Sequence, residues 1–175
     1  SARKLWFDDT FGRLNSDGKG EFLGSFDTED RILVVYHDGN YEITDTELSQ
    51  RFDVDQIIEI EKFDPERIIT AIWLDNEKLQ FNVKRFKIET TTLHNKFFFI
   101  KEGEGNYVEA VTSVDVPIVM VKSGRGAQAL VKKYKLADFV EVMGWKALGS
   151  KLADFSKSTE FEWVHKPQDP QTELF

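Results

Sequence analysis

Short apolar runs alternate with tight-turn sequences along most of the chain. Residues 32–36 (Ile-Leu-Val-Val-Tyr) form such a run, residues 37–40 (His-Asp-Gly-Asn) follow, and residues 41–44 alternate between apolar and polar. β-Branched and aromatic runs of this length predict strands. Asp-Gly between two such runs predicts a β-hairpin with a primed turn, because glycine accepts a positive φ there.

A second hairpin is predicted around the polar residues 75–77. Residues 68–74 form the first apolar run, and residues 79–83 alternate after the turn. After Val83 the apolar phase slips by one residue. The slip predicts a β-bulge near Lys84-Arg85, with a strand break there as the alternative.

Two further hairpins follow from the same signal. One connects residues 97–100 to residues 107–111 through a glycine-containing turn, and the other connects residues 118–121 to residues 129–131. A helix over residues 127–142 is the alternative for the last of these. Its apolar residues fit a helical stripe poorly, so we predict a strand.

Four hairpins without intervening helices predict an all-β fold of the sandwich, barrel or propeller-like type. We expect one domain over residues 1–165. Residues 166–175 read as a proline-containing linker and a short tail.

Composition removes several classes of site. The 175 residues include no cysteine, which excludes disulfides, cysteine-bound metals and thiol nucleophiles. No apolar run approaches the roughly 20 residues of a membrane helix. The chain begins with Ser-Ala and shows no signal segment, so we expect a fragment of a cytoplasmic protein.

Charge is distributed unevenly. The net charge of −8 argues against nucleic acid as a partner, but residues 122–157 hold 8 Lys and Arg against 3 Asp and Glu. Residues 1–121 hold 14 against 24, and residues 158–175 hold 1 against 4. The basic segment is either a solvated face or a strip that contacts phosphates.

Candidate catalytic groups form no recognisable motif. The three histidines, His37, His94 and His165, lie far apart and in no metal-binding spacing, so we expect surface or turn roles for them. No nucleophile elbow, Walker loop or dinucleotide fingerprint is present. We therefore expect no catalytic residue, and no metal or cofactor in this chain.

Several segments together resemble a known family. Residues 33–44 are similar to the repeat hairpin of the C-terminal domain of bacterial type II topoisomerase A subunits, and residues 131–152 are similar to its blade exit and inter-blade connection. Residues 4–14 and 61–66 resemble the topoisomerase IV A subunit of Bacteroidetes-type bacteria. The gyrase box Gln-Arg-Arg-Gly-Gly-Lys-Gly is absent, which favours topoisomerase IV over gyrase.

The resemblance implies a β-pinwheel, a propeller-like ring of hairpin blades, and the short chain implies an incomplete one. It implies an accessory domain that contacts the backbone of duplex DNA and assists strand passage, decatenation and relaxation. The implied partners are duplex DNA, the catalytic domains of the same A subunit and the topoisomerase B subunit, at the nucleoid and not at a membrane. ATP and Mg²⁺ would belong to other domains of the parent enzyme, as would the catalytic tyrosine.

If the resemblance holds, Lys and Arg side chains contact phosphates without reading bases. The candidates lie on the second and fourth predicted hairpins: Lys84, Arg85, Lys87, Lys122, Arg125, Lys132, Lys133 and Lys135.

Two other functions stay open. The acidic body would suit a protein-interaction module, and the last five residues resemble the Gln-x-x-Leu-Phe peptide that docks on the DNA polymerase sliding clamp. Gln171, Leu174 and Phe175 would make that contact. The third possibility is an unrelated all-β enzyme or ligand binder, which a pocket of converging ionisable groups would favour.

Overall fold

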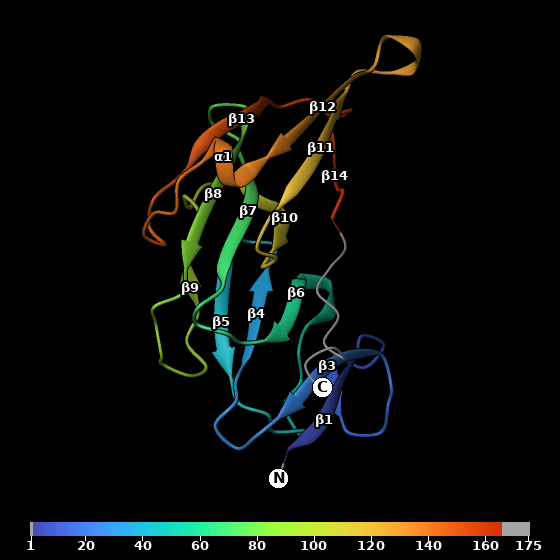
Figure 1. Ribbon diagram of the computed structural model, residues 1–175, viewed down its shortest axis with the longest axis vertical. Helices are drawn as coiled ribbons and strands as arrows, with labels where there is room; N and C mark the ends of the chain where they lie inside the picture. The colour runs from blue at the N-terminus through green and yellow to red at the C-terminus, as the bar shows by residue number, and fades with distance from the viewer. Residues whose placement is uncertain (1, 166–175) are drawn as a thin grey trace. The chain divides into compact units, whose positions relative to one another are not determined.

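The computed structural model describes residues 2–165 (Figure 1). The described residues form four antiparallel sheets, one turn of α-helix and two short 3₁₀ segments. They divide into two compact units, residues 2–64 with 90–97 and residues 65–89 with 98–165. The predicted domain over residues 1–165 thus contains two units, and its boundary with the tail stays a prediction.

Unit 1 holds a three-stranded sheet of order β2-β1-β3 and a four-stranded sheet of order β6-β4-β5-β9. The short segment η1 (Val54–Gln56) precedes β6. The strands are β1 (Arg3–Asp8), β2 (Arg13–Asn15), β3 (Glu21–Phe26), β4 (Ile32–Tyr36), β5 (Asn40–Thr44), β6 (Ile57–Lys62) and β9 (Phe97–Phe98), of which Phe98 already counts to unit 2.

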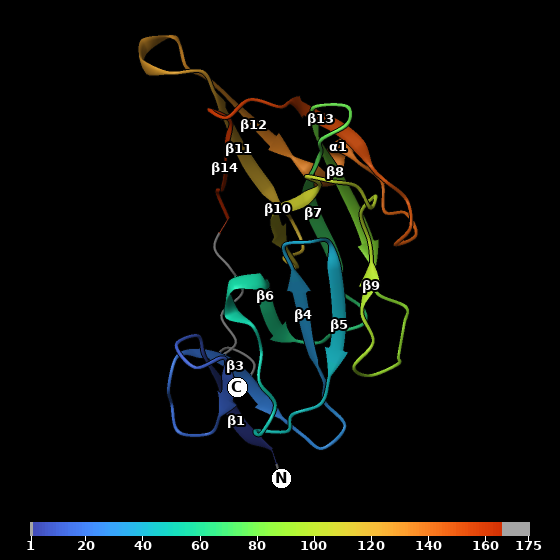
Figure 2. The same cartoon turned by 180° about the vertical axis from the view of Figure 1, so that it is seen from behind.

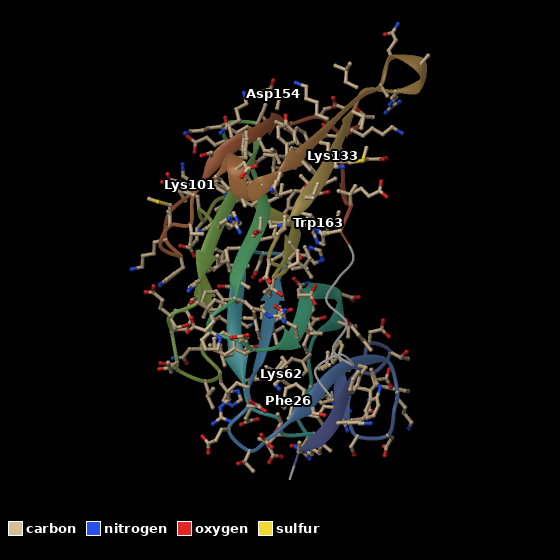
Figure 3. All side chains as sticks on the ribbon, viewed as in Figure 1. Phe26, Lys62, Lys101, Lys133, Asp154 and Trp163 are labelled. Carbon is tan, nitrogen blue, oxygen red and sulfur yellow. The ribbon has the colours of Figure 1, made fainter. Side chains whose placement is uncertain are left out.

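The core of unit 1 forms where the apolar residues of β1, β3, β4 and β6 meet, among them Leu5, Phe26 and Val34. All five residues of β4 are buried, as its unbroken apolar run requires. Lys62 lies against this core at the edge, with its Nζ 5.5 Å from the centre of the Phe26 ring and 2.8 Å from the Ser25 carbonyl oxygen (Figure 3).

The predicted hairpin of β4 and β5 is confirmed, but its turn is not a primed turn. Asp38 does not have a positive φ, whereas Gly39 has a φ of 95°. The Gly39 N–H donates to the Tyr36 carbonyl at 3.1 Å. A turn closed in this way, followed by one left-handed glycine, is the usual three-residue connection between antiparallel strands.

Unit 2 holds a four-stranded sheet of order β10-β7-β8-β13 and a three-stranded sheet of order β12-β11-β14. The segment η2 (Gly126–Gln128) lies in the β11–β12 turn, and helix α1 (Leu136–Phe139) follows β12. The strands are β7 (Ile68–Asp75), β8 (Gln80–Lys87), β10 (Tyr107–Thr112), β11 (Ile118–Ser123), β12 (Leu130–Lys135), β13 (Ser150–Asp154) and β14 (Glu160–Trp163).

The β7–β8 hairpin is confirmed, and the predicted bulge within it is wrong. The register runs without a shift from Ile68 opposite Lys87 to Asp75 opposite Gln80. The apolar phase slips because both faces of β8 are covered: residues 81–86 are all buried, including Lys84 and Arg85. Register shifts occur instead where β13 and β10 join this hairpin.

The predicted pairing of residues 97–100 with residues 107–111 is also wrong. Strand β9 pairs with β5, and β10 pairs with β7. The Phe97 ring stacks on Tyr41 with a centroid distance of 5.6 Å, which holds β9 on β5. The Asn106 side chain accepts a hydrogen bond from the Asn76 N–H at 2.7 Å, which directs the following strand to β7.

The fourth hairpin is confirmed and is longer than predicted, because β11 and β12 pair from Ile118–Lys135 to Ser123–Leu130. The helical alternative for residues 127–142 is limited to α1 and η2. The core of unit 2 packs these strands against β7, β8 and α1 through residues such as Val83, Val119 and Leu136. Figures 1 and 2 show the β11–β12 turn extending past the ends of the neighbouring strands.

Candidate nucleic-acid interface

The β11–β12 hairpin presents five of the predicted phosphate-contacting side chains to solvent. Lys122, Arg125, Lys132, Lys133 and Lys135 are all exposed. The turn that carries Arg125 bends sharply, with a φ of 86° at Gly124 and 60° at Gly126. Glycine adopts this left-handed conformation without strain, so the turn places an extended arginine between two sharp bends.

Strand register divides these cations between the two faces of the sheet. Side chains alternate along a strand, so Lys133 and Lys135 lie on one face of β12 and Lys132 lies on the other. Lys122 of β11 stands directly opposite Val131, on the same face as Lys133. Of the four lysines on this hairpin, Lys122, Lys133 and Lys135 therefore share one face of the sheet, and Lys132 lies on the opposite face.

Strand β14 adds carboxylates to the three-lysine face. Its register sets Glu160 opposite Lys122 and Glu162 opposite Met120. Opposite charges paired across strands stabilise a sheet modestly. Because these carboxylates border β11, the positive charge is strongest along β12 and around the turn. Figure 3 shows Lys133 on this hairpin.

A hollow of about 340 Å³ lies where the β11–β12 turn meets the turn before β14. Lys122, Arg125 and Lys157 line it, together with Ser158, Glu160 and the two turn glycines Gly124 and Gly126. Three cations and one carboxylate around a polar hollow suit an anionic group such as a phosphate.

Lys157 is the site residue that sequence reasoning missed. It comes to the hollow because β14 pairs with β11, a contact between residues nearly forty positions apart. The turn that carries it is held locally, since the Ser158 N–H donates to the Ser156 Oγ at 3.2 Å and the two hydroxyls lie 2.9 Å apart. The Ser-Lys-Ser sequence predicts a turn, but only the tertiary structure shows that this turn lies beside Arg125.

Lys84 and Arg85 are corrections to the predicted site, because both are buried and face no solvent. The Lys84 Nζ donates to the Phe99 carbonyl and, at 2.6 Å, to the Trp145 carbonyl. It also lies 4.8 Å from the centre of the Phe86 ring. Burial lowers the pKa of Lys84 to about 7.

Arg85 and Lys87 complete the second hairpin's cations. The Arg85 Nε donates to the Thr70 Oγ1 at 3.2 Å, inside the sheet, and burial lowers its pKa. Lys87 is partly exposed and forms an ion pair with Glu66 at 3.6 Å. The structure thus keeps only Lys87 of this group at the surface, beside a carboxylate.

The sequence model that describes the Bacteroidota topoisomerase C-terminal domain matches residues 13–158. The chain belongs to this family. Its members are accessory domains of topoisomerases, so the chain is an accessory domain of such an enzyme. No curated protein sequence matches the chain.

A solved structure supports the same fold for this topoisomerase C-terminal domain. The crystal structure of the C-terminal domain of DNA topoisomerase IV is similar with a TM-score of 0.57 and 13% sequence identity. The match covers 94% of this chain and 64% of that one, so the chain spans less than two thirds of the relative. The predicted all-β fold of the β-pinwheel type is confirmed.

The histidines of the topoisomerase C-terminal domain have structural contacts. His165 Nδ1 accepts a hydrogen bond from the Ile118 N–H at 3.2 Å, and burial lowers its pKa. His94 Nε2 lies 3.2 Å from the Asp45 carboxylate. Among residues 2–165, no three His, Asp or Glu side chains gather as metal ligands would. No helix in the same range has the length and apolar character to cross a membrane.

A second hollow, of about 500 Å³, lies in unit 1. Its lining mixes the cations Arg13, Lys19 and Arg51 with the carboxylates Asp8 and Asp17. This is the kind of pocket that an unrelated ligand binder would have. Family membership assigns the chain to the accessory domains instead. The clamp-docking residues Gln171, Leu174 and Phe175 lie outside the described residues, and that contact stays a prediction.

Proposed function

We propose that this accessory domain contacts the backbone of duplex DNA through the β11–β12 hairpin and so assists strand passage, decatenation and relaxation by a topoisomerase IV-like enzyme. The observation that carries the proposal is the convergence of Lys122, Arg125 and Lys157 on one hollow, beside the exposed lysines of β12. In the holoenzyme the domain would work beside the catalytic domains of the A subunit and the B subunit.

The physics of the contact is electrostatic. Each Lys or Arg that neutralises a phosphate releases condensed counterions, which favours binding without base readout. A guanidinium can bind two phosphate oxygens at once, and Arg125, in the β11–β12 turn, would make a contact of this kind. The hollow would take one phosphate, and Lys133 and Lys135 would take neighbouring phosphates.

Acidic groups set the direction of approach. The net charge of −8 repels DNA over most of the surface, and Glu160 and Glu162 border the β14 side of the hairpin. Repulsion falls off within a Debye length of about 8 Å at physiological salt. DNA would therefore approach over the turn and along β12, away from β14.

The proposal is tested with three hairpin substitutions made together, Arg125→Ala, Lys133→Ala and Lys135→Ala. We expect the affinity for a fluorescein-labelled duplex, measured by anisotropy, to fall at low salt. We also expect the slope of log K against log salt to fall by about 0.9 per lost phosphate contact.

The matched control removes three exposed cations of the same unit outside the hairpin, Lys78→Ala, Lys146→Ala and Lys151→Ala. We expect this variant to keep the wild-type slope. Equal losses in the two variants would show that DNA responds only to total charge, and the hairpin would not be the interface.

A further inference from the structure

We infer that the outer edge of β12 binds an extended acidic segment of a partner protein, which adds to the sheet as a fourth strand. The inference goes beyond DNA contact and does not depend on it. It concerns the backbone of β12, whereas the DNA proposal concerns its side chains.

Two of the other three hairpins show where a fourth strand would join the β11–β12 hairpin. The β4–β5 hairpin carries β6 on its first strand and β9 on its second, and the β7–β8 hairpin carries β10 and β13 in the same way. The β11–β12 hairpin carries β14 on its first strand, and no strand among residues 2–165 pairs with the outer side of β12. The β4–β5 and β7–β8 hairpins fill the position that is open on β12, whereas the short β1–β2 hairpin, which carries β3 on its first strand, leaves it open as well.

Backbone hydrogen bonds identify the free groups of β12. The Leu136 N–H donates to the Pro117 carbonyl at 3.0 Å, one step beyond the pair Lys135–Ile118. Bonded pairs alternate along an antiparallel ladder, so Tyr134, Lys132 and Leu130 turn their amides toward β11. Val131 and Lys133 therefore turn their N–H and C=O groups outward.

The edge is suited to accept a strand. Strand β12 pairs with β11 without a register shift, contains no proline, and exposes 64% of Leu130 and 51% of Val131. A long, regular edge with apolar side chains is a template for strand addition. Proteins often block such edges with bulges, prolines or lysines, and of these three devices β12 has only the lysines.

Charge selects the partner. Lys132, Lys133 and Lys135 would stand directly beside the side chains of an added strand, where like charges repel and opposite charges attract. A second copy of β12 would bring lysines against lysines, so the edge disfavours self-pairing. A segment with carboxylates opposite the lysines and β-branched residues opposite Leu130 and Val131 would match both the basic part and the apolar part of β12.

The test uses the chain with a blocked peptide, Glu-Val-Glu-Glu-Val-Val, and the charge-reversed peptide Lys-Val-Lys-Lys-Val-Val. Amide hydrogen exchange is followed by NMR. We expect the acidic peptide to slow exchange at Val131 and Lys133, while Lys132 and Tyr134 are already protected by β11. Protection by neither peptide, or equal protection by both, would overturn the inference.

A matched pair of variants separates backbone from charge. Lys133→Pro and Lys133→Ala both remove the ammonium group, but only proline removes the outward N–H, and an edge position tolerates proline. We expect Lys133→Ala to weaken peptide binding by about two- to fivefold. We expect Lys133→Pro to weaken it by about a further tenfold. Equal peptide affinities in the two variants would overturn the inference.

The same pair keeps this result distinct from DNA binding. Both variants lose the same charge, so their DNA affinities should be equal whatever the peptide does. If Lys133→Pro lowers the melting temperature, the exchange experiment on the unmodified chain still decides the question.

Discussion

Lys84 shows how one residue can carry a basic signature in the sequence and a structural role in the fold. Its Nζ bridges two backbone carbonyls, those of Phe99 and Trp145, which lie on different loops of unit 2. Both carbonyls are distant from Lys84 in the sequence, so no sequence pattern identifies them as its partners. The available signal was the position of Lys84 in an otherwise apolar strand. A charged residue in such a strand is exposed only when one face of the strand is free of contacts, and otherwise it is buried.

Burial of Lys84 makes stability depend on pH. Its pKa is about 7 in the folded chain and near its ordinary value of 10.5 when unfolded, so between these values the unfolded chain binds more protons. Stability should rise with pH over this window, by at most about 1.4 kcal/mol per pH unit. Lys84→Met should abolish the rise, as followed by urea unfolding from pH 7 to 10. A rise that persists in Lys84→Met would exclude Lys84 as its source.

Glu59 on β6 predicts the opposite trend at lower pH. Burial, together with the neighbouring charges of Glu61 and Glu21, raises its pKa from 4.5 to about 8. Between these values the folded chain holds a proton that the unfolded chain has lost, so stability should fall as pH rises from 5 to 8. Glu59→Gln should flatten this decline in thermal unfolding. The substitution Glu89→Gln, at an exposed carboxylate, should leave the decline unchanged.

At the scale of elements, local signals predicted the hairpins and missed the strands that join them from a distance. The β4–β5, β7–β8 and β11–β12 pairs form between strands that are neighbours in the sequence, and their turns can be recognised from the sequence. One full hairpin lies in the sequence between β9 and the hairpin that it joins, and the same is true of β13. The partners of these two strands therefore depend on the order of the sheets. The pairing of β14 with β11 brought Lys157 to the candidate site in the same way.

One glycine fixes such a distant pairing and gives an element-scale prediction. Gly149, just before β13, has a φ of 86°, and a Cβ there would lie 2.1 Å from the Val83 carbonyl oxygen. Gly126 also has a positive φ, of 60°, but open space around it. Gly126→Ala should destabilise unit 2 by about 1–2 kcal/mol through backbone strain alone.

Gly149→Ala should cost about 2 kcal/mol more than Gly126→Ala, since backbone atoms must move. Tryptophan fluorescence during urea unfolding would report the change, because the Trp73 Nε1 donates to the adjacent Leu148 carbonyl at 2.9 Å. Equal destabilisation by the two substitutions would mean that β13 relaxes without leaving β8.

For the whole molecule, the sequence predicted the fold class and the uneven charge, and the structure decides which charges are usable. Of the eight predicted phosphate-contacting residues, Lys84 and Arg85 are internal, and Lys87 is paired with Glu66. The five on the β11–β12 hairpin are exposed, and they are joined by Lys157. Charge counts along a chain cannot separate these cases, because burial depends on tertiary contacts.

An acidic domain that binds DNA through one basic hairpin should show a duplex affinity that depends steeply on salt. Fluorescence anisotropy of the unmodified chain should show binding that weakens with salt, with a slope of about −2.7 for the three phosphate contacts of the hairpin. No binding at low salt, or binding independent of salt, would mean that the β11–β12 hairpin is not a DNA interface.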